Sequence, residues 1–387
     1  MKRLPEYLLV LFALVGTLSI AVSQAVMTAG AFVVLGDRGK RTVLVRPDTG
    51  LLWPVLGWAA ASVLATLFSS DILASTINLK KLALLGMLFW APAVVTRRWS
   101  IGRLVMALLF GAGITSLYGC FTFFFRQGGP ALDVRIRGFH GFYLTNAGML
   151  LLCSFPALLV STQRRLAASH RLGAAIAAAS ILAVLYFGRI HSAWLGSVAG
   201  LGYLMIVRRR RIAAAVLALF ALSFLVAPSV VREAGHDLVS PSSDANVDRL
   251  RMWGHGLRIF AQRPWTGWGL HDLRDVYAQV MGPGETAQGH LHSVPLTVAA
   301  QMGIPGLVAL AWLVVGLFGA LRRSRTGVVP GFELDVVDAV EAGLVAFLAA
   351  GLVDWNLGDS EILTLLCFLV GVAVAAGRVG HEPAAAA

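Results

Sequence analysis

The sequence predicts an all-α polytopic membrane protein with about twelve transmembrane helices and one large, partly helical loop outside the cytoplasm. Hydrophobic residues make up 57% of the chain and charged residues 13%, whereas a soluble domain has roughly 25% charged residues. Apolar runs near the ~20 residues that cross a hydrocarbon core of about 30 Å recur along the chain. Lys and Arg fall in short clusters between these runs, as residues that set membrane orientation do.

The apolar runs define the expected elements in order. The spans lie near residues 7–21, 23–36, 51–69, 76–95, 101–119, 143–161, 173–188, 192–207, 212–228, 298–320, 335–353 and 360–377. The first two are short and closely joined, so eleven spans remain an alternative. Lys2 and Arg3 precede an apolar run, as in a signal peptide, but the unbroken series of later spans favours an uncleaved first helix.

These spans divide the chain into four parts. Helices 1–9 occupy residues 1–228, the large loop residues 229–297, helices 10–12 residues 298–378, and an Ala-rich tail, expected to be disordered, residues 379–387. With a cytoplasmic N-terminus, every dense basic cluster falls on the cytoplasmic side. The clusters lie at residues 38–46, 97–98, 164–171, 208–211 and 322–325.

The net charge of +12 raises the possibility of nucleic-acid binding, but its distribution argues against it. There is no long basic arm and no basic stripe interleaved with aromatic residues. Polar side chains that topology does not explain gather on the opposite face. They lie in residues 121–141, 188–192, 229–297 and 354–359. A cluster of Arg and His on that face suggests a site for an anionic, lipid-borne substrate.

Four stretches carry a family resemblance. They are Gly-Arg-Ile-His-Ser-Ala-Trp-Leu-Gly at 188–196; Asp-Arg-Leu-Arg-Met-Trp at 248–253 followed by Arg-Pro-Trp-Thr-Gly-Trp-Gly at 263–269; His-Leu-His-Ser-Val-Pro-Leu at 290–296; and, faintly, Arg-Gly-Phe at 137–139 with Asn146. In this order they make the chain resemble the O-antigen ligases and related polysaccharide polymerases of bacterial inner membranes, over about residues 50–375. Two positions depart from the family pattern: His191 stands where the family has Arg, and Ser293 where it has Asn.

The resemblance implies transfer of a glycan from undecaprenyl pyrophosphate to an acceptor hydroxyl at the periplasmic face of the inner membrane, preferably on lipid A-core. Guanidinium groups suit the pyrophosphate because they form bidentate, charge-assisted hydrogen bonds to phosphate oxygens. Arg249 and Arg189 are the candidates for this role, although Arg249 could instead pair with a neighbouring Asp and Arg189 could be an interface residue. His292 is the candidate general base, since an imidazole accepts protons near neutral pH.

Further residues are expected to bind substrate. They are His290, His191, Arg251, Arg137 and Lys81. Trp253, Trp265 and Trp268 could stack on sugars or, more simply, lie at the bilayer interface. Pro305 with Gly303 and Gly306 allows a kink or close helix packing in the tenth span.

No metal or cofactor is expected. His290, His292 and His191 could supply three nitrogens, but the acids of the loop lack ligand spacing. Glu333-Leu334-Asp335 has the right spacing but falls on the cytoplasmic side. Cys120, Cys153 and Cys367 lie at unrelated spacings.

Several activities remain open. A polymerase or a glycan transferase acting on a protein such as pilin would use the same residue types. A transporter or flippase is the alternative of a different class, and it predicts charges deep inside spans. The span charges lie toward the helix ends in the predicted scheme, which favours an enzyme at the membrane surface. They are Lys80, Lys81, Asp338, Glu341 and Glu361.

Overall fold

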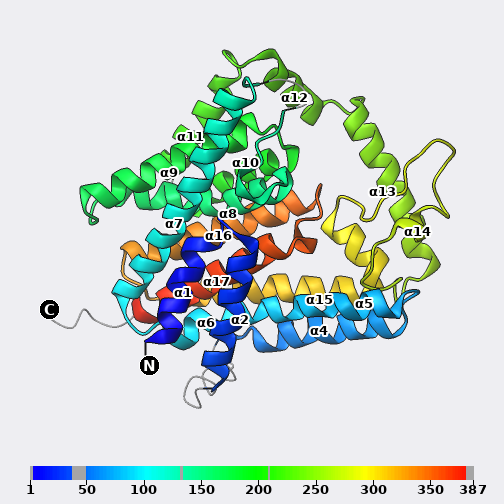
Figure 1. Ribbon diagram of the computed structural model, residues 1–387, viewed down its shortest axis with the longest axis horizontal. Helices are drawn as coiled ribbons and strands as arrows, with labels where there is room; N and C mark the ends of the chain where they lie inside the picture. Colours follow the sequence, from blue (N-terminus) through cyan, green and yellow to red (C-terminus); the bar gives the residue numbers. More distant parts are fainter. Residues whose placement is uncertain (1–2, 37–48, 131–133, 208–209, 381–387) are drawn as a thin grey trace.

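The computed structural model describes residues 3–36, 49–130, 134–207 and 210–380, and every regular element in these ranges is a helix. The predicted all-α class is therefore confirmed (Figure 1). In chain order the elements are α1 (Leu4–Val15), α2 (Ile20–Gly36), α4 (Leu52–Leu67), α5 (Ile72–Asn78), η2 (Leu79–Gly86), α6 (Met87–Val94), α7 (Arg98–Phe121), η3 (Thr122–Arg126), η4 (Gly138–His140), α8 (Tyr143–Thr162), α9 (Ala168–Phe187), α10 (His191–Val207), α11 (Arg210–Ser223), α12 (Ser229–Val239), α13 (Asp244–Gln262), α14 (Arg274–Tyr277), α15 (Val294–Arg325), α16 (Phe332–Gly351), η5 (Asn356–Gly358) and α17 (Ser360–Gly380).

Within the described residues, six helical stretches are long and apolar enough to cross a membrane. They are Ile72–Val94, Arg98–Arg126, Tyr143–Thr162, Ala168–Phe187, Val294–Arg325 and Ser360–Gly380. Four further predicted spans coincide with shorter apolar helices, α1, α2, α4 and α10. The chain is thus a membrane-type helical protein, and the count of twelve spans stays a prediction. The basic cluster at 38–46 and tail residues 381–387 lie outside the described residues, while α17 continues to Gly380.

The predicted span at 335–353 corresponds to α16, which contains too many acidic residues to qualify as a membrane span by composition. It packs against α8, α10 and α17, and its acidic side chains Asp338 and Glu341 are buried. Arg325 of α15 lies 3.2 Å from an Asp338 oxygen and 3.7 Å from a Glu341 oxygen, so one cation lies beside both buried carboxylates and offsets part of their charge. Glu341 is ten residues into a helix of 20, so the expectation that it lies near a span end is wrong.

The bundle has two chemically different ends. At one end, which we call the terminal end, the described residues of the basic clusters hold chain ends and turns together: Arg98 donates to the Val379 carbonyl (3.2 Å), and Arg165 to the Pro330 carbonyl (3.1 Å). The beginning of α1 and the end of α17 lie toward this end in Figure 1, and α13 and α14 lie at the other, the loop end. These contacts join connections that the charge pattern places on one side, while the membrane orientation stays a prediction.

At the loop end, residues 264–269, which precede α14, form hydrogen bonds with a kink in α15. Gly303 has φ 63° and ψ −158°, which interrupts the helix, and the Ile304 N–H donates to the Pro264 carbonyl (2.8 Å). The Trp268 and Gly269 N–H groups donate to α15 carbonyls exposed by this kink, each over 2.9 Å. Of the two possibilities left open for Gly303, Pro305 and Gly306, a kink or close helix packing, the structure shows a kink. The hydrogen bonds at this kink anchor the large loop to α15.

Candidate functional site

A cavity of about 410 Å³ at the loop end gathers cationic and acidic side chains from distant parts of the sequence. We call it the arginine cavity. Its lining comprises Arg135, Tyr143, Leu144, Arg189, Ile190, His191, Ser192, Val230, Glu233, Ala234, Asp237, Arg249, His292, Val353 and Asp354. Three of the residues expected from the sequence to act in catalysis, Arg189, Arg249 and His292, therefore share one cavity.

Arg189 lies in the tight turn between α9 and α10. Gly188 ends α9 with a hydrogen bond from its N–H to the Val184 carbonyl (2.8 Å), and Arg189 then takes a left-handed conformation with φ 53°. Its side chain is buried, and one guanidinium nitrogen donates to the Val134 carbonyl over 2.8 Å. This hydrogen bond joins the turn to residues 134–137, so the guanidinium is held in place before any ligand binds.

Arg249 reaches the same cavity from α13. One guanidinium nitrogen donates to the Asn246 side-chain oxygen one turn earlier (2.9 Å). Burial lowers the pKa of Arg249 from its ordinary value, and the Asp354 carboxylate opposes that shift. Arg251, two residues on, faces another direction and lies 3.8 Å from Glu285. The structure thus brings Arg249 to the cavity and leaves Arg251 outside its lining.

His292 stands directly before α15, with Asp354 beside it. The histidine has φ 43°, and its Nδ1 lies 3.6 Å from an Asp354 carboxylate oxygen. Asp354 accepts hydrogen bonds from the Trp355 N–H (2.8 Å) and the Ser192 hydroxyl (3.1 Å). Burial acts to raise the pKa of Asp354, but contact with His292 and the Trp355 N–H outweigh it and bring the pKa below its usual range. An anionic carboxylate therefore faces one ring nitrogen of His292.

Sequence reasoning missed two members of the site, Asp354 and Arg135. The sequence placed residues 354–359 and 121–141 on the same predicted face as the large loop, but no motif distinguished these two side chains. Arg135 lines the cavity, and its Nη1 is buried without a hydrogen-bond partner among the described residues. Arg137, the residue expected to bind substrate, is exposed and outside the lining, because it leaves the extended path and begins the turn of η4.

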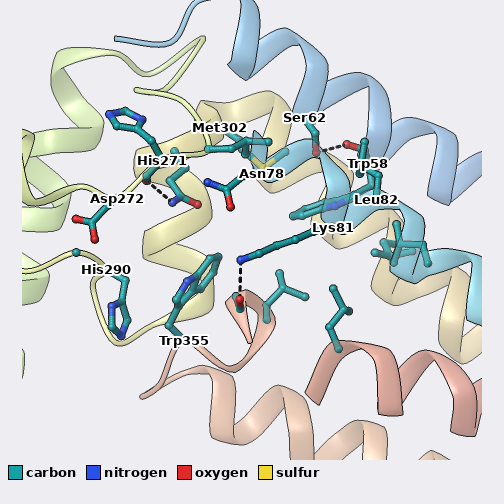
Figure 2. A pocket seen from close by; sticks show the side chains of 18 residues that line it. Trp58, Ser62, Asn78, Lys81, Leu82, His271, Asp272, His290, Met302 and Trp355 are labelled. Atoms are coloured by element: carbon teal, nitrogen blue, oxygen red, sulfur yellow. Dashed lines mark hydrogen bonds between the residues drawn. The ribbon is translucent and has the colours of Figure 1, made fainter. Parts of the chain in front are cut away.

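Two more of the expected substrate-binding residues, His290 and Lys81, line a neighbouring cavity of about 310 Å³ (Figure 2). The Lys81 ammonium donates to the Gly358 carbonyl over 2.7 Å. Burial and the adjacent His292 lower the pKa of His290 to about 4, so its imidazole is neutral at physiological pH. The remaining expected residue, His191, lines the arginine cavity.

The tryptophans of the loop lie outside both linings. Trp268 packs inside the loop, with Arg263 over its ring at 4.1 Å and its indole N–H donating to the Ile259 carbonyl (3.0 Å). Trp265 is 69% exposed. In the described part of the chain, no three His, Cys, Asp or Glu side chains are grouped so that they could hold a metal ion.

Comparison with known families covers part of the chain that lines this site. Residues 174–311 match the family model described as O-antigen ligase, which confirms the resemblance found in the sequence. The matched stretch begins in α9, ends in α15 and contains Arg189, Arg249 and His292, whereas Arg135 and Asp354 lie outside it. No curated protein matches the chain.

Proposed function

We propose that this chain, similar to the O-antigen ligase family over residues 174–311, transfers a glycan from undecaprenyl pyrophosphate to lipid A-core without a metal ion. The loop end would face the periplasm and the terminal end the cytoplasm of a bacterial inner membrane. The observation that carries the proposal is the meeting of three arginines with a His–carboxylate pair in one cavity. Membrane association and the family match are consistent with it.

The arginines are assigned to the pyrophosphate, which is both the anchor of the donor and the leaving group. Arg189, Arg249 and Arg135 come from three separate segments, so together they can surround an anion from several directions. Guanidinium groups remain charged at any physiological pH and stabilise the negative charge that develops as the glycosidic bond breaks. Loss of one such donor commonly lowers the rate by about 10²–10³-fold.

His292 is assigned to the acceptor. Its ring accepts the proton of the acceptor hydroxyl while the hydroxyl oxygen forms a bond to the anomeric carbon. The bond from that carbon to the pyrophosphate oxygen breaks, and its electron pair leaves with the pyrophosphate. Such direct displacement inverts the configuration at the anomeric carbon. General base catalysis of this kind contributes about 10²–10⁴-fold.

Asp354 is assigned to positioning His292. A carboxylate facing Nδ1 favours the tautomer with the proton on that nitrogen, which leaves Nε2 free to accept the hydroxyl proton. The carboxylate also stabilises the imidazolium that forms after proton transfer. Asp354→Asn keeps the shape of the side chain but removes the charge, so we expect transfer to fall by about 10²-fold.

The test is glycan transfer in reconstituted membranes containing EDTA, with lipid-linked glycan as donor and lipid A-core as acceptor. Wild type is compared with His292→Ala, with Asp354→Asn, and with His170→Ala as a control on an exposed histidine of α9. We expect transfer by wild type and the control, a loss of about 10²–10⁴-fold in His292→Ala, and a loss of about 10²-fold in Asp354→Asn. Normal transfer by His292→Ala would contradict the assignment of the base.

The products separate the other activities. Longer lipid-linked glycan with unmodified lipid A-core would identify a polymerase. Modification of an added pilin with no change to lipid A-core would identify a protein glycan transferase. Movement of the lipid-linked glycan across the membrane without any transfer would identify a transporter or flippase.

A further inference from the structure

The second cavity, which we call the tryptophan cavity, lies between α4, η2, α15 and the segment around η5 (Figure 2). Trp58 and Trp355 supply its indole rings, while Asn78, Lys81 and Asp272 supply amide, ammonium and carboxylate groups. The volume of about 310 Å³ is within the range of small-ligand sites. This cavity contributes none of the arginines assigned to the pyrophosphate.

A thin wall made of two backbone segments separates the two cavities. In the first segment, His290 faces the tryptophan cavity and His292 the arginine cavity, with 4.4 Å between their ring centres. In the second segment, Trp355 faces the tryptophan cavity and the adjacent Asp354 faces the arginine cavity. The His292–Asp354 pair therefore stands at the boundary between the two cavities.

The lining of the tryptophan cavity combines apolar side chains, among them Leu82, Leu85 and Leu313, with indole, amide and carboxylate groups of the kind that bind a sugar. Indole faces pack against the C–H faces of a pyranose, and amide and carboxylate groups satisfy its hydroxyls. The Asn78 amide donates to the Ala74 carbonyl (3.1 Å) and the Asp272 carboxylate accepts from the Arg274 N–H (2.9 Å), so each keeps part of its hydrogen-bonding capacity for a ligand. Among the described residues no arginine lines this cavity, whereas three line the arginine cavity, which makes the tryptophan cavity the poorer site for a pyrophosphate. The Lys81 hydrogen bond to the Gly358 carbonyl fixes the segment that carries Trp355.

We propose that the tryptophan cavity binds a sugar residue of the acceptor glycan, close to the residue whose hydroxyl attacks the donor. The inference rests on the proposed function, because it takes the arginine cavity as the pyrophosphate site. In a direct displacement the attacking oxygen and the leaving group lie on opposite sides of the anomeric carbon. With the pyrophosphate in the arginine cavity, the acceptor arrives from across the wall, and neither cavity is enclosed.

The experiment measures kcat, the KM of lipid A-core and the KM of the lipid-linked donor for purified, reconstituted full-length protein. Trp58→Ala removes one indole, Trp58→Phe keeps an aromatic ring, and Trp53→Ala is the control on an exposed tryptophan of the same helix. The inhibition constant of undecaprenyl pyrophosphate reports separately on the arginine cavity. Asn78→Ala provides a second, smaller change in the same lining.

We expect Trp58→Ala to raise the acceptor KM by about 10-fold, as loss of an aromatic stacking contact does. The donor KM and the inhibition constant are expected to stay within about twofold of wild type, and Trp58→Phe to restore most of the acceptor affinity. Asn78→Ala is expected to raise the acceptor KM by about 3–10-fold. If Trp58→Ala does not fold, the acceptor KM of Asn78→Ala decides whether the proposal holds.

Two results would overturn the inference. One is a higher donor KM with an unchanged acceptor KM, which would place the donor glycan in the tryptophan cavity. The other is an unchanged acceptor KM in folded variants of both Trp58 and Asn78. Failure of the proposed function looks different, since wild type itself would then transfer no glycan to lipid A-core.

Discussion

At the scale of single residues, strained backbone coincides with the candidate chemistry. Arg189 and His292 are the two non-glycine residues with positive φ in the described chain, and both line the arginine cavity. Such conformations cost about 1–3 kcal/mol and persist where surrounding structure enforces them. Here the enforcing elements are the α9–α10 turn and the start of α15. The strain supports a functional role for both side chains independently of the family match.

Arg135 provides a prediction that the sequence motifs do not make. Arg135 lines the cavity, and its buried Nη1 has no hydrogen-bond partner among the described residues, so Arg135→Ala should lower the transfer rate by about 10²-fold. Arg126→Ala, an exposed arginine of the preceding segment, is the matched control and should stay within about twofold. If Arg137→Ala lowered the transfer rate as much as Arg135→Ala, the placement of Arg135 inside the site and Arg137 outside it would be wrong.

His290 provides a prediction about pH and stability. Its pKa is about 4 in the folded chain against 6.5 ordinarily, so between these values the unfolded chain binds a proton that the folded chain does not. The free energy of unfolding therefore falls as the pH drops through this window. His290→Gln removes that effect, and its Tm should fall less than that of wild type between pH 7 and pH 4, by about 2–4 °C.

The measurement is thermal unfolding in detergent at both pH values. His170→Gln, at an exposed histidine, is the control and should follow wild type. An equal fall of Tm in His290→Gln and wild type would show that His290 titrates normally in the folded protein.

The residues that could be predicted from sequence are those with local signatures. Arg189, Arg249 and His292 each sit in a short motif, and the structure brings all three together. Asp354 lies 62 positions after His292 and joins it only through the packing of α15 and α16, which a local pattern does not report. The choice between Arg135 and Arg137 depends on where an extended segment turns into η4, and the sequence contains no strong signal for that turn.

At the scale of elements, the kink of α15 organises the loop end. Gly267, with φ 66°, lies against the backbone of Gln301 and Met302 beside the kink. A Cβ there would collide with main-chain atoms, which cannot move away as a flexible side chain can. The Gly-Trp-Gly segment at 267–269, which resembles a family motif, therefore fixes the first part of α15 and, with it, the position of His292.

Gly267→Ala tests this role. We expect a loss of roughly 1–3 kcal/mol in the free energy of unfolding, because the substitution adds strain at a left-handed residue as well as a collision. The lower Tm should be accompanied by weaker glycan transfer as His292 shifts. Gly254→Ala on α13, where a Cβ meets open space, is the control and should not lower the Tm. Equal Tm values for Gly267→Ala and Gly254→Ala would contradict this role of Gly267.

One predicted element was simpler than the observed one. The run at 76–95 reads as one continuous helix, but the structure divides it into α5, η2 and α6. Hydrophobic composition does not distinguish a 3₁₀ stretch from an α-helix, since both satisfy their backbone groups internally. Lys81 lies in η2, from where it reaches the Gly358 carbonyl beside the tryptophan cavity.

At the scale of the whole molecule, the side that charge predicts for each connection agrees with described contacts, while the number of spans stays a prediction. Contacts such as Arg165 to Pro330 and Ser70 to Trp268 each join segments on the same predicted side. The number of spans is harder to predict, because α1 has 12 residues and α16 carries buried acids paired with Arg325. Burial inside the bundle permits charge that contact with lipid would not.

Cysteine labelling tests the membrane orientation. In a Cys120→Ser background, Ser242→Cys between α12 and α13 should react with a membrane-impermeant maleimide in intact spheroplasts. Val329→Cys, at an exposed position of the terminal end, should react only after permeabilisation. The reason is that the basic clusters of the terminal end favour the cytoplasm. The reverse pattern of labelling would invert the topology and place the arginine cavity in the cytoplasm.

The wall between the two cavities has a consequence for fidelity. His290 and His292 share one short backbone segment, as do Asp354 and Trp355, so a shift of the group on one side of the wall would be passed to the group on the other. If the tryptophan cavity binds the acceptor as proposed, a glycan that fits badly against Trp355 or His290 would misalign Asp354 or His292. Wrong acceptors would then be rejected by slow chemistry as well as by weak binding. The lipid-linked glycan would be protected from wasteful attack by water until a correct acceptor aligns the base.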